Sequence, residues 1–180
     1  MRSEKVALLA EGGSERAILD LLLDNHKLIF TREDLLGEEV IKIRNAATFQ
    51  RKHLNHSSDR KVKIYRIHDS KRERFKLAKA YISKITLPIE EIYTTPEIEI
   101  LIIILKGDYQ KYAKDNSKSK CKPSLYVKKN YKDLHDFKNY DSTYNFWETR
   151  IEDLVQCIKL YSRFTADSIN NTLCSLLIKP

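Results

Sequence analysis

The sequence predicts an α/β fold, Rossmann-like in character, with a mostly parallel sheet flanked by helices. Short apolar runs that suit strands alternate with segments whose apolar residues recur at helical spacing, first over residues 5–24 and again from residue 62. Repeated strand-helix units imply parallel strands joined by right-handed crossovers. We expect an α/β domain over residues 1–135 and a helical C-terminal extension over residues 136–180, packed on the same domain.

The first strand-helix unit is the most informative part of the chain. Val6–Ala10 is a continuous apolar run typical of a strand covered on both faces. Ser14 is a suitable N-cap for a helix that carries Ile18, Leu21 and Leu22 on one side. The sequence therefore predicts strand, turn and helix over residues 5–24.

Further elements are predicted in order along the chain. A second strand is expected at residues 40–43, a helix at 46–56, a third strand at 62–67 and a helix from 72 to 85. Residues 96–105 are ambiguous, because β-branched residues favour a strand while the length and the initial proline suit a buried helix.

The last third of the chain changes in character. Residues 115–122 predict a mobile surface loop, since they are mostly lysine, serine and asparagine. Apolar residues at 151, 154, 155, 158 and 161 predict an amphipathic helix, and those at 169–177 a short final helix.

Composition limits the classes of function. The formal net charge is +8 with a pI near 9.3, which favours a polyanionic partner such as nucleic acid, although a basic protein without such a partner fits too. No apolar run suits a signal peptide or a membrane span, so we expect a cytoplasmic protein that does not bind membranes. Cys121, Cys157 and Cys174 are too far apart in the sequence for a zinc motif and odd in number.

Acidic residues follow two of the expected strands. Glu11 ends the first strand and Asp69 the third, and ligands of doubly wound sheets bind at the carboxyl ends of strands. We expect the two carboxylates to share one site with Mg²⁺ or Mn²⁺, which suits phosphoryl transfer, and Glu73 to reach the same metal or cap its helix. Alternatively, Glu11 is a turn residue and Asp69 an N-cap. His68 is a minor candidate for a base or a phosphate contact.

The order of strand, Glu11-Gly12, helix, two further strand-helix units and Asp69 resembles the Toprim fold of topoisomerases, primases and OLD-type nucleases. Residues 94–100 are similar to the Asn-Pro-x-Phe-Glu-x-Trp stretch of its RloB-like branch, and residues 122–129 to the basic segment of that branch. The resemblance covers residues 5–135 and implies that Pro96 starts a helix.

The resemblance also implies roles for individual residues. Glu11 would act as general acid or base and Asp69 would hold Mg²⁺, as the first aspartate of an Asp-x-Asp pair. Lys71 stands where the second aspartate should be, so Glu73 or Glu99 would have to complete the metal site. If neither does, the fold would bind nucleic acid without cutting it.

Basic residues would hold the phosphate backbone. Arg72 and Arg74 lie beside Asp69 in the sequence, and Lys71 or Arg72 would balance charge in the reaction. Lysines interleaved with Tyr112 and Tyr126 form a second basic region, which would hold a phosphate backbone or, alternatively, is only a solvated surface. These lysines are Lys111, Lys114, Lys118, Lys120, Lys122, Lys128 and Lys129.

These features predict a Mg²⁺-dependent Toprim-type endonuclease that hydrolyses phosphodiester bonds in DNA or RNA. The family resemblance implies a role in bacterial anti-phage defence, with an ATPase partner protein, and a homo-oligomer is compatible with it. One alternative is a catalytically silent nucleic-acid-binding or partner-binding module. A nucleotide-binding enzyme ranks third, because Gly12-Gly13 lacks the Walker lysine and the dinucleotide fingerprint.

Overall fold

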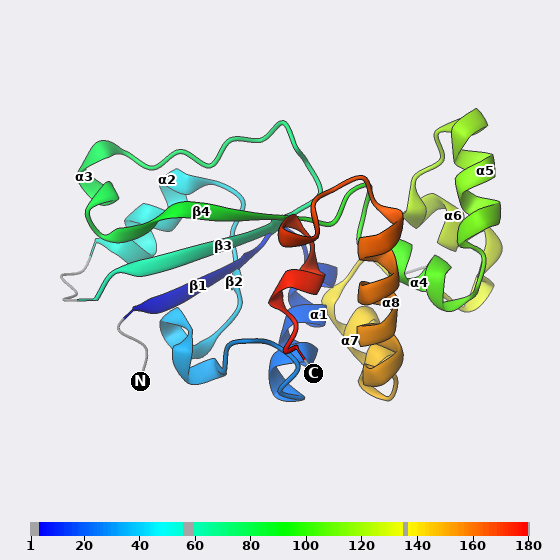
Figure 1. Ribbon diagram of the computed structural model, residues 1–180, viewed down its shortest axis with the longest axis horizontal. Helices are drawn as coiled ribbons and strands as arrows, with labels where there is room; N and C mark the ends of the chain where they lie inside the picture. The colour runs from blue at the N-terminus through cyan, green and yellow to red at the C-terminus, as the bar shows by residue number, and fades with distance from the viewer. Residues whose placement is uncertain (1–3, 56–59, 135–136, 180) are drawn as a thin grey trace.

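The computed structural model describes residues 4–55, 60–134 and 137–179. Its centre is a sheet of four parallel strands in the order β2-β1-β3-β4 (Figure 1). The strands are β1 (Lys5–Ala10), β2 (Ile41–Lys42), β3 (Val62–His68) and β4 (Ile85–Tyr93). The predicted α/β class with a parallel sheet is therefore confirmed, and the arrangement is consistent with a Rossmann-like fold.

Helices make up most of the rest of the described chain. The α-helices are α1 (Gly13–Asp24), α2 (Ala46–Phe49), α3 (Lys79–Ile82), α4 (Ile100–Leu105), α5 (Tyr109–Ser119), α6 (Pro123–Asn130), α7 (Tyr140–Glu148) and α8 (Ile151–Phe164). Short 3-10 or π turns are η1 (Arg32–Asp34), η2 (Leu36–Glu38), η3 (Gln50–Leu54), η4 (Lys132–Leu134), η5 (Ile169–Asn171) and η6 (Leu173–Leu176).

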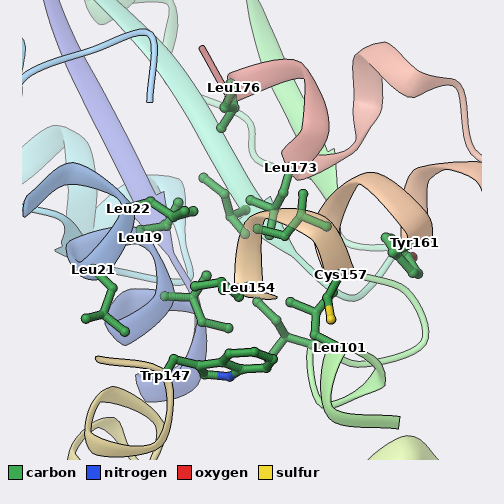
Figure 2. Packing of buried hydrophobic residues seen from close by; sticks show 14 of the residues in the cluster. Leu19, Leu21, Leu22, Leu101, Trp147, Leu154, Cys157, Tyr161, Leu173 and Leu176 are labelled. Carbon is green, nitrogen blue, oxygen red and sulfur yellow. The ribbon is translucent and has the colours of Figure 1, made fainter. Parts of the chain in front are cut away.

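The two faces of the sheet have different covers. On one face α1, α4, α7, α8 and the C-terminal turns share a large buried cluster with β1 and β3, in which Trp147, Leu154 and Leu101 are buried (Figure 2). A smaller cluster on the other face contains Phe49 of α2 and Phe75. Helices α5 and α6 lie beyond the carboxyl ends of the strands, beside α4 (Figure 1).

The predicted helix over residues 72–85 is wrong for most of its length. Only α3 is helical, and Ile85 begins β4, a strand that the sequence analysis did not predict. Phe75 and Leu77 are buried while Lys76 between them is exposed, which is the two-residue alternation of an extended chain lying on the sheet. Burial by the sheet therefore overrides the helical spacing of this segment.

The ambiguous segment is helical, but Pro96 does not start the helix. Helix α4 begins at Ile100 and residues 100–104 are all buried. A helix buried all round has no amphipathic period, which explains why the pattern could not distinguish it from a strand.

Other expectations had mixed outcomes. The predicted loop over residues 115–122 is wrong, because α5 continues to Ser119, and the predicted helix over 151–161 is confirmed as α8. The final segment forms two 3-10 turns, and the predicted helix at 46–56 is α2 followed by the π turn η3. The end of that helix at residue 56 and the domain boundary at 135/136 lie outside the described residues.

Across the three described ranges of the chain, no helix has both the length and the apolar character needed to cross a membrane.

The beginnings of α1 and α7 are held together at the carboxyl end of β1. Ser14 was predicted to cap α1, but the N-cap is Gly12. The Ser14 hydroxyl instead donates to the carbonyl oxygen of Phe137 at 3.3 Å and lies 3.1 Å from Oγ1 of buried Thr143. A Cβ at Gly13 would lie 3.0 Å from the backbone nitrogen of Tyr140, so the absence of a side chain allows this close approach.

We expect Gly13→Ala to destabilise the protein by about 1 kcal/mol in urea unfolding, although alanine is the better helix former. The added methyl group would meet backbone atoms of α7 that cannot move independently. Gly12→Ala is the matched control, because its methyl group would meet only the end of the flexible Glu15 side chain. A Gly13→Ala protein that is more stable than wild type would show that the two helices tolerate separation.

Candidate functional site

The chain segments that follow β1, β3 and β4 meet at the carboxyl edge of the sheet. They line a pocket of about 150 Å³, here called the acidic pocket, whose described lining residues are Gly12, Gly13, Ser14, Glu15, Asp69, Glu97, Glu99 and Lys138. Four carboxylates and one ammonium group therefore face one small space. This is the edge where open parallel sheets bind ligands.

Glu99 is the most perturbed acid of the pocket. It is 5% exposed, and burial raises its pKa to about 7, with a further upward contribution from Glu97 and Glu15. The pKa of Glu15 is also raised, first by burial and then by the charges of Asp69 and Glu11. Buried carboxyl groups with raised pKa values gather at functional sites more often than elsewhere.

Glu97 has the opposite electrostatic environment. Burial would raise its pKa, but contacts from Ser124 and Lys138 outweigh this effect and lower the pKa. The backbone nitrogen of Ser124 donates to Oε2 at 3.0 Å and Lys138 Nζ donates to Oε1 at 3.1 Å. Glu97 therefore stays ionised and fixes Lys138 at the pocket, beside α6.

Asp69 is partly exposed, and its carboxylate has no ion pair among the described residues. Within the same ranges, no group of three or more histidine, cysteine or acidic residues lies close enough to enclose a metal ion. Mg²⁺ does not need such a cage, because it is commonly held by one or two carboxylates, water molecules and a substrate phosphate. Asp69 and Glu99 or Glu15 fit that type of site.

The structure does not place Glu11 in the acidic pocket. Its side chain is 5% exposed, and its Oε1 accepts a hydrogen bond of 2.8 Å from Arg66 Nη2. The Arg66 guanidinium, 1% exposed, also contacts Glu73 at 3.2 Å and Glu91 at 3.5 Å. We call these four residues the arginine cluster. The pKa of Glu11 is raised by burial, against the effect of Arg66.

Strand geometry explains why Glu11 and Asp69 are separated. Side chains alternate between the faces of a strand, and Ala10 of β1 lies beside Ile67 of β3. Glu11, one residue after Ala10, therefore points to the face of Arg66, whereas Asp69, two residues after Ile67, returns to the face of α1. The expectation that both carboxylates share one site is not met, and Glu73 lies with Glu11.

Lys71 and His68, the other candidates for a catalytic role, are also held by acidic residues outside the acidic pocket. Lys71 forms an ion pair with Asp167, which follows α8, and does not line the acidic pocket. His68 is buried and its Nε2 lies 2.6 Å from Glu91 Oε2, so it belongs beside the arginine cluster.

The predicted nucleic-acid-binding residues lie on the surface. Arg72 and Arg74 are exposed in the segment after β3, and Lys111 is exposed on α5. Lys122 is the N-cap residue of α6 and its Nζ lies 3.7 Å from Glu97 Oε1, and Lys128 and Lys129 are exposed at the end of that helix. Lys114 and Lys120 belong to the same region, and the side chain of Lys118 lies outside what the structure describes.

Sequence reasoning did not select Glu15, Glu97 or Lys138. Glu15 stands four residues after Glu11, in the first turn of α1, and Glu97 stands two residues before Glu99. The closeness of Glu97 to Glu99 in the sequence was a readable signal. The spacing of Glu15 from Glu11 was not, because Glu11 precedes α1 and lies on the face of Arg66. Nothing in the local sequence identifies Lys138, which reaches the pocket only through the docking of α7.

The raised pKa of Glu99 predicts a pH-dependent stability. The unfolded carboxyl ionises near 4.5 and the folded one near 7, so the free energy of unfolding should fall as pH rises between these values. The loss is up to about 3 kcal/mol, and Glu99→Gln should abolish it in urea unfolding between pH 5 and pH 8. Glu97→Gln is the control, because the lowered pKa of Glu97 stabilises the fold at high pH instead. Equal pH profiles for wild type and Glu99→Gln would contradict the assignment.

The arginine cluster predicts a strong coupling between two buried residues. Arg66→Met should cost about 3 to 5 kcal/mol of unfolding free energy, because it leaves the Glu11 carboxylate buried without its cation. The double variant Arg66→Met/Glu11→Met should recover part of this loss. Equilibrium unfolding measures both, and strictly additive effects of the two substitutions would contradict a direct ion pair.

Comparisons with protein-family models, with curated proteins and with solved structures each found no significant match. The resemblance to Toprim enzymes therefore stays a prediction from the residues of this chain.

Proposed function

We propose that the protein is a metal-dependent nuclease of the Toprim type that hydrolyses phosphodiester bonds in DNA or RNA. One observation carries the proposal: carboxylates from the ends of three parallel strands line one pocket, with the pKa of Glu15 and of Glu99 raised. Mutual repulsion between acids held this way is relieved when a divalent cation joins them. The net charge of +8 supports a polyanionic substrate.

The residues of the pocket take separate roles in this proposal. Asp69, with Glu99 or Glu15, would hold Mg²⁺ or Mn²⁺, which when bound polarises a phosphate and lowers the pKa of water. Lys138 balances negative charge on the phosphate, because Glu97 fixes its ammonium at the edge of the pocket. A carboxyl group with a pKa near 7 such as Glu99 is also suited to accept or return a proton at neutral pH.

Glu11 and Lys71 lose the catalytic roles that the family resemblance implied. Glu11 neutralises Arg66 and Lys71 pairs with Asp167, so both contribute to the structure around the site in the proposed arrangement. The proposed catalytic set therefore consists of Glu15, Asp69 and Glu99, with Lys138 as the cation.

A catalytically silent binding module is the second candidate. The absence of a group of three or more metal-ligating residues among the described ones favours it, as does the engagement of Glu97 with Lys138. Such a module would bind nucleic acid through the basic surface and would need no metal. Its binding would weaken steeply as salt rises.

The test is cleavage of labelled single- and double-stranded DNA and RNA with Mg²⁺ or Mn²⁺. We expect Asp69→Asn and Glu99→Gln each to reduce the cleavage rate at least about 100-fold, the size of effect found when a group stabilising the transition state is removed. Glu148→Gln, an exposed acid at the end of α7 outside the pocket, should retain wild-type cleavage.

Thermal unfolding supplies a readout that does not depend on activity. Mg²⁺ should raise the Tm of wild type and of Glu148→Gln, and should raise that of Asp69→Asn less. Stabilisation by Mg²⁺ without cleavage would show that the protein binds the metal but is not a nuclease. Neither stabilisation nor cleavage, with intact salt-sensitive binding, would establish the silent module.

A further inference from the structure

A second and larger hollow adjoins the acidic pocket. It has a volume of about 420 Å³ and shares Glu99 and Lys138 with the acidic pocket, so the two spaces are neighbours. Residues of α6 form one wall, and residues 134 and 137–139 form the other. We call this hollow the side pocket. Its volume lies within the range of sites that bind small molecules.

The lining of the side pocket combines apolar surface with cations. Leu125 on α6 is 57% exposed, and Leu134 and the largely buried Phe137 also line the pocket. Lys128 and Lys138 add positive charge. An apolar lining with ammonium groups beside it complements a nucleobase attached to phosphates, because the faces of a base make apolar contacts and phosphates are held by charge.

We infer that the side pocket holds one unpaired nucleotide of the substrate strand, next to the phosphate that would enter the acidic pocket. The inference rests on the proposed function and names the substrate class more narrowly. A base inside a duplex is stacked on both faces and cannot enter a pocket without leaving the stack. The protein therefore acts on single strands or on locally opened ends, and not on intact duplex.

Two matched pairs of substitutions test the inference. Leu125→Asn removes apolar surface from the side pocket, whereas Leu87→Asn changes a leucine of the same exposure, 58%, on β4 and outside that pocket. Lys128→Ala removes a cation of the side pocket, whereas Lys61→Ala removes an exposed lysine just before the amino end of β3. All four residues are exposed, and unchanged Tm values would confirm that the variants fold.

The measurement is fluorescence anisotropy of a labelled 12-nucleotide single strand and of the corresponding blunt duplex, in EDTA so that no cleavage occurs. We expect the single strand to bind at least about tenfold more tightly than the duplex. Leu125→Asn should raise the Kd for the single strand about tenfold, because the variant loses apolar area that the leucine would bury against the base, while Leu87→Asn should change it less than about twofold. Lys128→Ala should reduce the slope of log Kd against log salt by about one, and Lys61→Ala should not.

Several outcomes would overturn the inference. They are equal affinity for duplex and single strand, equal effects of Leu125→Asn and Leu87→Asn, or no binding of either probe. A free nucleoside monophosphate that binds more tightly than the strand would reassign the side pocket to a small-molecule ligand. Binding that depends on Leu125, in a protein that never cleaves, would refute the proposed function alone. Cleavage that is insensitive to Leu125→Asn would refute the side-pocket inference alone.

Discussion

The pairing of β1 with β3 determines which side chains reach the candidate site. The two strands run in parallel and in register from Lys5 beside Val62 to Ala10 beside Ile67. Because side chains alternate between faces, this register also decides on which side of the sheet the residues after each strand lie. A shift of β3 by one residue would turn its side chains to the opposite faces and move Asp69 to the face of Glu11 and the arginine cluster. The composition of the acidic pocket is therefore a consequence of strand register.

The arginine cluster explains why the acid after the first strand is unavailable for chemistry. Arg66 occupies a central position of β3 and is almost fully buried, so its charge must be compensated within the protein. Glu11 makes the shortest contact to it, at 2.8 Å, and Glu73 and Glu91 complete the surroundings. An acid released from this arrangement to act in catalysis would leave a buried cation behind. The next acid along the chain, Glu15, faces the pocket without that cost.

The sequence was sufficient for the parts of the fold in which local pattern and burial agree. β1 has a continuous apolar run, α1, β3 and α8 have recurring apolar residues, and all four lie where they were expected. The prediction of a helix over residues 72–85 failed, because the burial of this segment comes from the sheet on which it lies. No local sequence pattern records that contact. The sequence of helix α4 was ambiguous, because a helix that is buried on all sides has no amphipathic pattern.

The residues of the candidate site could be predicted only in part. Asp69 was identified because it follows a strand that can be read from sequence, and Glu99 through the resemblance of residues 94–100 to the RloB-like stretch; both line the acidic pocket. Glu11 was equally prominent in sequence, but its position depends on the partner strand, since only the register with β3 brings it to Arg66. Lys138 could not be predicted, because it lies about 120 residues from Glu15 along the chain and reaches the pocket through the packing of α7 on α1. Gly13 permits the close contact between these two helices.

The distribution of charge predicts that binding of the strand and binding of the metal are coupled in the proposed reaction. The acidic pocket has more carboxylates than cations among its described residues, so by itself it repels a phosphate. The attractive charges lie beside it, on α6 and at Lys138, where the side pocket offers apolar surface as well. In the proposed reaction, a strand held there would have its phosphate at the mouth of the acidic pocket, and a divalent cation would remove the repulsion. Binding of the strand and of the metal would then be mutually favourable, because the cation offsets the repulsion between the pocket and the phosphate, and the phosphate supplies a further oxygen ligand to the cation. This coupling distinguishes the proposed nuclease from a silent module, whose affinity for a strand would not depend on a divalent cation beyond ordinary screening by salt.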